Sequence, residues 1–131
     1  RQTSDNPVYY VQYAHARIAS ILRLAQEQGI KYQDGDLSRL THPAEQLLIK
    51  KMLMLPELVD FIARSLEPHH ISHYSMELAN AFHWFYQQCR VISENSSDQD
   101  VMEARLKLVA AAKIVLASSL ELMGMRAPDK M

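Results

Sequence analysis

The feature that most constrains the fold is a long helical pattern near the start of the chain, from Asn6 to Gly29. Asn6 is a favourable N-cap because its side-chain oxygen accepts a backbone N–H that has no partner within the helix. Pro7 follows at the first helical position, where a missing N–H costs nothing. Gly29 favours a left-handed helix end. Between these signals, apolar residues recur at helical spacing and predict one buried face: Val11, Ala14, Ile18, Leu22 and Ala25.

The other faces of this predicted helix mix aromatic and hydrogen-bonding side chains, where a plain surface helix carries Glu and Lys. One stripe holds Tyr9, Tyr13 and Arg17. A second stripe holds Gln12, His15 and Arg23. Rings and guanidinium groups stack on unpaired bases, and polar side chains hydrogen-bond to base edges. We therefore expect this helix to form one wall of a surface that reads RNA.

The rest of the chain predicts further helices joined by polar connections. Pro43 begins a second helix, and Pro56 interrupts it, with a kink or a break into two abutting helices. A later helix spans 71 to about 91, and the last runs from an N-cap at Asp98 to Met123. A chain of 131 residues is the size of one domain. We expect one all-α domain over residues 1–131, a bundle of about four to five helices.

Apolar side chains outside the first helix also fall on predicted buried faces. They include Leu37, Leu40, Val59, Leu66, Phe82, Trp84, Phe85 and Leu122. The tyrosines of the first helix have a packing interpretation too, since a buried Tyr needs only one polar partner.

Composition excludes several classes of function. The net charge of −1 excludes a generic polyanion binder, so any contact with nucleic acid must be a local patch. The single cysteine, Cys89, cannot form an internal disulfide, which favours a reducing compartment such as the cytoplasm. No apolar run approaches the roughly 20 residues that cross a bilayer, so we expect no membrane contact. Residues 1–5 contain neither an initiator Met nor a signal segment, and we expect a piece of a longer polypeptide.

Three histidines, His69, His70 and His73, raise the possibility of a metal site. His70 and His73 are spaced so that they share a helix face, as metal ligands do. No Cys or carboxylate cluster completes such a site in the sequence, so a polar start to a helix is the favoured interpretation and we expect no metal. A nucleophilic role for Cys89 is weaker still, because no orienting group is indicated beside it.

Four segments carry a resemblance to a known family. Residues 6–18, NPVYYVQYAHARI, resemble the helix that opens the C-terminal domain of bacterial arginyl-tRNA synthetases. Residues 77–86, ELANAFHWFY, followed by Cys89, Arg90 and Val91, are similar to the next signature helix of that family. Residues 104–109, ARLKLV, resemble its last helix, and residues 127–131, APDKM, resemble its final residues. The resemblance covers nearly the whole chain, in order.

The resemblance implies the helical anticodon-binding domain of class I aminoacyl-tRNA synthetases, named for an Asp-Ala-Leu-Arg signature. Here Met102-Glu103-Ala104-Arg105-Leu106 keeps that signature only in part. The whole family enzyme joins arginine to its tRNA with ATP and magnesium, in an upstream catalytic domain with His-Ile-Gly-His and Lys-Met-Ser-Lys-Ser motifs. Neither motif is present in this chain. The resemblance therefore implies a non-catalytic, cofactor-free RNA-binding fragment whose partners are arginine tRNA and its own catalytic domain, and we expect a monomer.

The residues of the implied site follow from the chemistry of single-stranded loops. Tyr13, Tyr86 and Arg90 are the expected stacking platforms. Gln12, His15 and Arg17 offer donors and acceptors to base edges or phosphates. In the family, the segment after the Phe-x-x-Phe-Tyr helix and the extreme C-terminus approach the anticodon, which implies Tyr86, Arg90 and Met131. Arg105 begins the last helix, where it could meet phosphates. The candidate site is Gln12, Tyr13, His15, Arg17, Tyr86, Arg90, Arg105 and Met131.

Other interpretations remain open at this point. His15 is compatible with a hydrogen-bonded structural role, and Arg105 is compatible with an ion pair to Glu103. The chain is also compatible with a free-standing helical module that binds proteins through an aromatic groove, or with the related domain of another class I synthetase such as the cysteinyl enzyme. The RNA hypothesis predicts that the aromatic face of the first helix is exposed beside Tyr86, Arg90 and the C-terminus.

Overall fold

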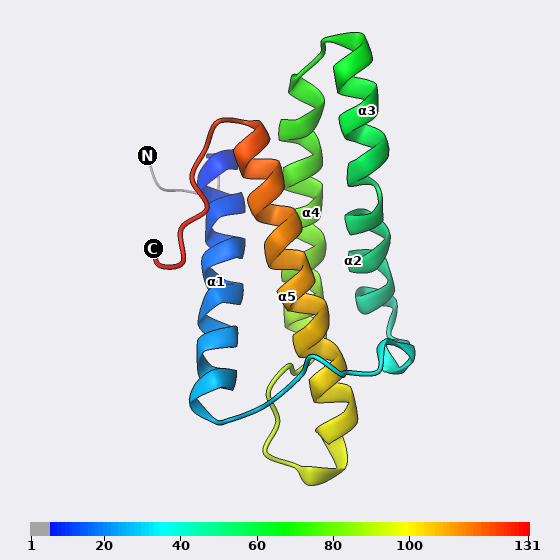
Figure 1. The fold of residues 1–131 in the computed structure, drawn as a ribbon, viewed down its shortest axis with the longest axis vertical. Coiled ribbons are helices and arrows are strands. Elements are labelled where there is room, and N and C mark those ends of the chain that lie inside the picture. Colours follow the sequence, from blue (N-terminus) through cyan, green and yellow to red (C-terminus); the bar gives the residue numbers. More distant parts are fainter. Residues whose placement is uncertain (1–5) are drawn as a thin grey trace.

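The computed structural model describes residues 6–131, and the chain folds as an all-α bundle, as predicted (Figure 1). Within this range it has the α-helices α1 Pro7–Glu27, α2 Pro43–Leu53, α3 Leu55–Ser65, α4 His69–Gln88 and α5 Gln99–Leu122. Two short 3₁₀ turns, η1 Leu37–Arg39 and η2 Ser96–Asp98, lie in the connections. Residues 1–5, from which we expected a longer polypeptide, lie outside the described residues.

The ends of α1 follow the predicted capping chemistry. The Asn6 side chain accepts a hydrogen bond from the Tyr9 backbone N–H at 3.2 Å, and Pro7 stands at the first helical position. Gly29 adopts a left-handed conformation with φ of 68°. The next N–H, of Ile30, then reaches back to the carbonyl of Ala25 at 2.9 Å and satisfies one of the last carbonyls of the helix.

Pro56 divides the second helical region into two abutting helices, one of the two outcomes predicted. α2 ends at Leu53 and α3 begins at Leu55, with Met54 in a helical backbone conformation between them. α2 starts with a reciprocal cap: the Ala44 N–H donates to Nδ1 of His42 at 3.0 Å, and the His42 N–H donates to Oε1 of Glu45 at 2.8 Å.

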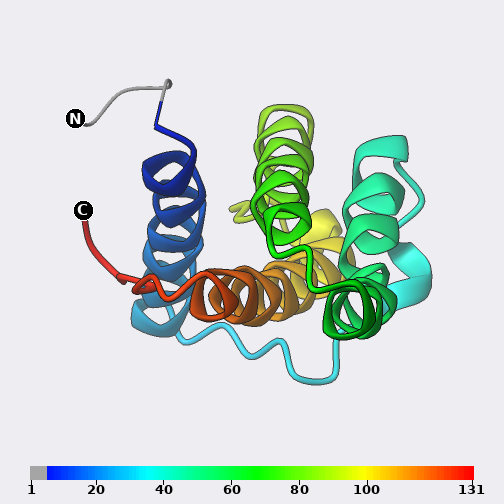
Figure 2. The same ribbon diagram turned by 90° about the horizontal axis from the view of Figure 1, so that it is seen from above.

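α4 and α5 form the centre of the bundle. α1 packs against both of them on one side, and α2 packs against both on the other, with α3 continuing beyond α2 along α4 (Figures 1 and 2). The largest fully buried side chains come from the facing surfaces of α1, α2, α4 and α5, and from the connection before α2. They include Val11, Ile18, Leu40, Leu48, Leu78, Phe82, Phe85, Leu106, Leu116 and Leu120.

Several side chains that we expected to be buried are exposed. They are Leu37, Val59, Leu66, Trp84 and Leu122. Trp84 follows Phe82 by two residues, about 200° around the helix, so burial of Phe82 turns Trp84 outward. Val59 and Leu66 belong to α3 and its C-cap, at the outer edge of the bundle, where α3 packs mainly against α4 and α2.

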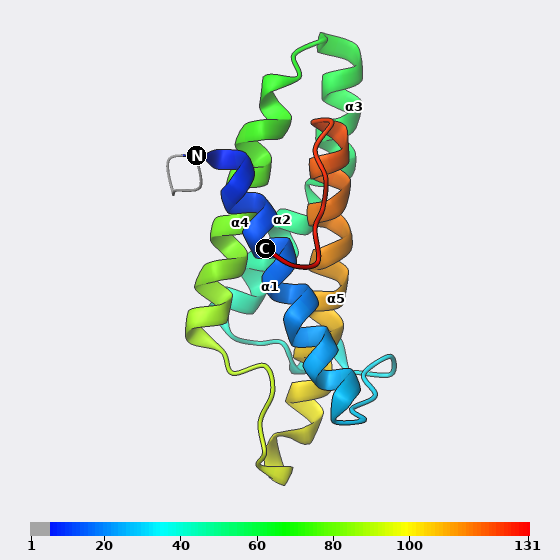
Figure 3. The ribbon, with the colours of Figure 1, turned by 90° about the vertical axis from the view of Figure 1, so that its left-hand side faces the viewer.

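The segment after α5 turns back along the molecule. Gly124 has a φ of 73°, and residues 125–131 then run beside α1 (Figures 1 and 3). We call residues 125–131 the tail. The long connection between α1 and α2 crosses α5 at Gly35, where a Cβ would lie 2.5 Å from the carbonyl oxygen of Glu103. Within the described part of the chain, no helix has the length and apolarity needed to cross a membrane.

Candidate nucleic-acid interface

Arg17 lies between two partly exposed tyrosines that come from different helices. Tyr13 precedes Arg17 by one turn of α1, whereas Tyr86 lies near the end of α4. The guanidinium carbon of Arg17 is 5.1 Å from the centre of the Tyr13 ring and 4.4 Å from the centre of the Tyr86 ring. The two tyrosines are 38% and 39% exposed. The arrangement therefore presents three flat groups to solvent, held together by cation–π contacts.

His83, a residue of α4, packs against the aromatic side chains of α1. Its ring stacks on Tyr13 with 5.8 Å between centroids and 22° between planes, and it lies 4.9 Å from the ring of Tyr10. Burial, reinforced by the charge of Arg17, lowers the pKa of His83 to about 4. The imidazole is therefore neutral near pH 7 and adds no charge next to Arg17.

Two adjoining hollows meet at Tyr86, and together we call them the α1–α4 groove. The first, of about 540 Å³, is lined by Tyr13, Ala16, Arg17, Ser20, Ile21, Arg23, Leu24, Tyr86, Lys130 and Met131. The second, of about 570 Å³, is lined by Ile21, Leu24 and residues 86–92. Four of these residues are cationic, namely Arg17, Arg23, Arg90 and Lys130, and none of the described lining residues is Asp or Glu. A chain of net charge −1 thus carries a local cationic patch.

The groove brings together five of the eight residues predicted from the sequence. Tyr13 and Arg17 come from α1, Tyr86 from α4, Arg90 from the segment after it, and Met131 from the tail. The aromatic face of α1 is open and lies beside Tyr86, Arg90 and the tail, which is the arrangement that the RNA hypothesis required. Flat groups and cations in one open groove suit unpaired bases and their phosphates.

A family model described as "DALR anticodon binding domain" matches residues 11–131. The chain belongs to this family. Known proteins agree: an arginine–tRNA ligase of Dehalococcoides mccartyi is 56% identical over 131 residues, which are 100% of this chain and 23% of that protein. An arginine–tRNA ligase of Heliobacterium modesticaldum is 47% identical, over 100% of this chain and 24% of its own length.

A solved structure of similar fold supports the same assignment. The arginyl-tRNA synthetase of Plasmodium falciparum matches with a TM-score of 0.76 and 27% sequence identity, covering 93% of this chain and 21% of its own. The chain thus spans about a quarter or less of the length of these relatives. In each case, the match identifies the chain as similar to one part of a longer protein.

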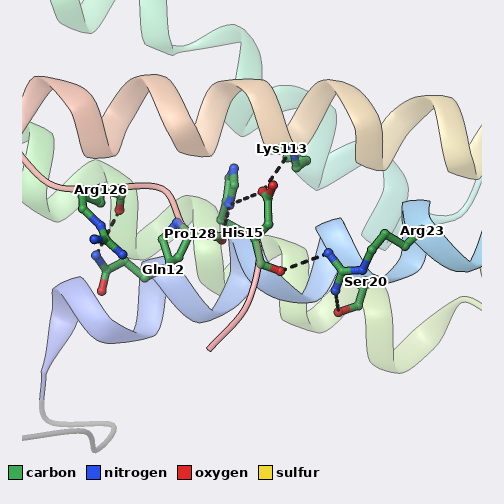
Figure 4. A network of polar contacts seen from close by, with 8 residues as sticks. Gln12, His15, Ser20, Arg23, Lys113, Arg126 and Pro128 are labelled. Carbon is green, nitrogen blue, oxygen red and sulfur yellow. Dashed lines mark hydrogen bonds and ion pairs between the residues drawn. The ribbon is translucent and has the colours of Figure 1, made fainter.

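Gln12 and His15 lie on α1 of this DALR-family domain but hydrogen-bond to the tail. Nε2 of Gln12 donates to the carbonyl of Arg126 at 3.0 Å, and Nδ1 of His15 lies 2.7 Å from the carbonyl of Pro128 (Figure 4). His15 is only 3% exposed. The structure thus places His15 in the structural role that the sequence left open. Neither side chain faces the groove.

Arg105 is likewise engaged within the domain. Its Nε donates to Oε2 of Glu45 at 2.6 Å, and another guanidinium nitrogen donates to the backbone carbonyl of Arg90 at 2.9 Å. Glu45 is 1% exposed, so this is a largely buried ion pair, with a different acid from the Glu103 considered in the sequence. Arg105 therefore attaches the segment of Arg90 to α2 and α5, instead of offering a free cation to phosphates.

The groove also includes residues absent from our candidate site. Ser20 and Leu24 follow Arg17 by one and two turns of α1, so helical periodicity alone could have found them. Lys130 adjoins Met131, so the same argument from the C-terminus indicates it. No sequence pattern indicates His83, because its role depends on the packing of α4 against the aromatic face of α1.

The histidines at the start of α4 lie near the α3–α4 turn, whereas Tyr86 lies near the other end of the helix. Ligand atoms of Glu67, His69 and His70 lie within 4.8 Å of one another, so Glu67 supplies a carboxylate that the sequence did not indicate. Nε2 of His70 lies 2.8 Å from Oε2 of Glu67, and His73 pairs instead with Glu77 at 3.3 Å. Hydrogen bonds between surface His and carboxylate side chains account for these contacts. Burial raises the pKa of the Cys89 thiol, which opposes a nucleophilic role.

Proposed function

We propose that this chain binds the anticodon loop of an arginine tRNA, as the anticodon-binding part of an arginyl-tRNA synthetase. The observation that carries the proposal is the α1–α4 groove, where the partly buried Arg17 lies beside the exposed rings of Tyr13 and Tyr86, with further cations in the lining. Membership of the anticodon-binding family and similarity to arginine–tRNA ligases support it.

In this proposal, bases that leave the stack of the loop lie against the rings of Tyr13 and Tyr86. Each such contact contributes about 1–3 kcal/mol. Arg17 keeps its contacts with both rings and donates hydrogen bonds to a base edge. Arg23, Arg90 and Lys130 meet phosphates, which position the loop without reading its sequence. The thioether of Met131 adds an adaptable apolar contact within the same hollow.

The ligation of arginine to tRNA, with its ATP and magnesium, belongs in this proposal to the larger remainder of such a protein. The chain spans only 23% of the first relative's length. No residue of the chain is assigned a catalytic role. Its proposed partners are arginine tRNA and the catalytic part of the same polypeptide, with a monomer as the working unit and the cytoplasm as its compartment.

The test is a titration of the chain with a stem-loop that carries an arginine anticodon, against the same stem-loop with the middle base changed. We expect the arginine loop to bind more tightly by about tenfold, which corresponds to about 1.4 kcal/mol. Both affinities should fall as salt rises, because a few phosphates are neutralised. Equal affinities at matched salt would contradict the proposal and favour a groove that binds protein.

A further inference from the structure

Three side chains of α1 hydrogen-bond to the backbone of the tail. Gln12 donates to the carbonyl of Arg126 at 3.0 Å and Arg23 donates to the carbonyl of Asp129 at 3.3 Å (Figure 4). Between them, His15 lies 2.7 Å from the carbonyl of Pro128. A carbonyl oxygen only accepts, so Nδ1 of His15 carries the hydrogen in this contact.

α5 holds the same tail from its other side. Nζ of Lys113 lies 3.6 Å from Oδ1 of Asp129, and Nδ1 of His15 lies 4.0 Å from the same oxygen. Ala127 packs partly buried against the core. The tail is thus attached to two helices over four consecutive residues, 126–129. We call the contacts of Gln12, His15, Arg23 and Lys113 with the tail the tail clasp.

The hydrogen bonds of Gln12, His15 and Arg23 fix the path of the tail backbone, because their partners are backbone carbonyls. Lys113 adds a contact with the side chain of Asp129. The tail has no regular secondary structure of its own, so ordering it costs conformational entropy that other contacts must offset. His15 is well placed to do so, because a polar group that is 3% exposed is stabilised only when it is hydrogen-bonded.

The last residue held by the tail clasp is Asp129, two residues before Met131. Beyond Asp129, Lys130 and Met131 line the same hollow as Tyr13, Arg17 and Tyr86. Met131 itself is 54% exposed, so its own burial is too small to hold it there. Its place in the groove therefore depends on where the preceding residues are held.

We propose that Gln12 and His15 are positioning residues of the RNA site: they hold the tail so that Met131 stands in the α1–α4 groove, and they do not touch RNA. This inference rests on the proposed function. It replaces the base-reading role that the sequence indicated for these two residues with an indirect one. A purely structural role would affect stability alone and leave the discrimination between loops unchanged.

The first experiment observes Met131 without RNA. The chain carries seven methionines, and labelling their methyl groups with carbon-13 gives one NMR signal for each. Met131→Leu identifies the signal of Met131. Because Met131 lines the same hollow as Tyr13 and Tyr86, we expect ring currents to displace this signal from its free position. In His15→Leu and in Gln12→Leu we expect this signal to move to the free position, while the signals of the methionines outside the tail stay. His15→Asn places an amide N–H donor where Nδ1 of His15 stood, so we expect the Met131 signal to return to its original position.

The second experiment measures discrimination by the same variants, as the ratio of affinities for the arginine loop and the loop with a changed middle base. We expect the ratio to fall by about tenfold in His15→Leu and to recover in His15→Asn. Arg126→Ala is the matched control, because Gln12 uses only the backbone carbonyl of Arg126. Gln12 is only partly buried, so Gln12→Leu keeps the test valid if His15→Leu fails to fold.

A Met131 signal that stays in place in both leucine variants overturns the inference, as does an unchanged ratio of affinities. Failure of the proposed function gives a result that differs from failure of this inference. In that case the unaltered chain does not discriminate between the loops, whereas the NMR experiment still reports whether Gln12 and His15 hold Met131.

Discussion

The guanidinium group of Arg17 lies 4.4 Å from the centre of the Tyr86 ring, so it occupies space between two rings from different helices. The contact joins α1 to α4 at the open surface of the groove. It depends on a flat cation, because a guanidinium stacks on a ring over its whole plane and an ammonium does not.

We therefore predict that Arg17→Lys weakens binding of the arginine loop although the charge is kept. The expected loss is about 1 kcal/mol, the size of a partly exposed cation–π contact. Arg64→Lys is the control, since Arg64 is an exposed arginine of α3 that pairs with Asp60. Filter binding at fixed salt measures both. Equal affinities of Arg17→Lys and the unaltered chain would show that charge alone acts at this position.

Tyr86 and Trp84 provide a matched pair for the role of stacking. Both belong to α4 and both are 39% exposed, but only Tyr86 lines the α1–α4 groove. We predict that Tyr86→Ala reduces loop affinity by about 1–3 kcal/mol, whereas Trp84→Ala leaves it unchanged. Under the proposed function, Tyr86→Ala in a full-length arginyl-tRNA synthetase should raise the KM for arginine tRNA. A similar loss in both variants would place RNA somewhere other than the groove.

His83 makes stability depend on pH. Its pKa falls from 6.5 to about 4 on folding, through burial first and the charge of Arg17 second. As the pH falls below 6.5, the unfolded chain takes up this proton before the folded chain does. The stabilising effect is complete above pH 6.5 and is lost as the pH falls toward 4.

The corresponding variant is His83→Phe, which keeps a ring against Tyr13 and removes the titration. Urea unfolding at about pH 7 and about pH 5 gives the change in unfolding free energy for each protein. We expect a smaller loss on acidification in His83→Phe than in the unaltered chain. The comparison isolates His83, because the two proteins differ at this position alone. Identical losses would mean that His83 is protonated as easily in the folded state as in the unfolded one.

The buried pair of Arg105 and Glu45 predicts a non-additive effect on stability. Arg105→Met leaves the carboxylate of Glu45 buried without its cation, which should cost about 3–5 kcal/mol of unfolding free energy. Adding Glu45→Gln removes the unpaired charge while an amide oxygen still accepts from the His42 N–H. The double variant should therefore be more stable than Arg105→Met alone. Chemical denaturation of the four proteins completes the double-mutant cycle, and additive losses would contradict a buried pair.

The candidate site could be predicted in part because its members follow a local pattern. Tyr13 and Arg17 are one turn apart, so any helix over that segment places them side by side. Tyr86, Arg90 and Met131 were indicated by resemblance and not by geometry. The roles of Gln12, His15 and Arg105 could not be read in this way, because each is decided by a partner far along the chain: Arg126, Pro128 and Glu45.

The sequence by itself determined both ends of α1 and the break between α2 and α3, whereas α4 spans His69–Gln88 and not the predicted residues 71 to about 91. The cap of Asn6, the left-handed Gly29 and the break at Pro56 act on backbone groups within a few residues, so the rest of the molecule is not needed to place them. Only the tertiary structure decided which polar side chains remain free. Burial and hydrogen bonding depend on what packs against a face, and the return of the tail along α1 takes His15 out of solvent while it leaves Tyr13 and Arg17 open to it.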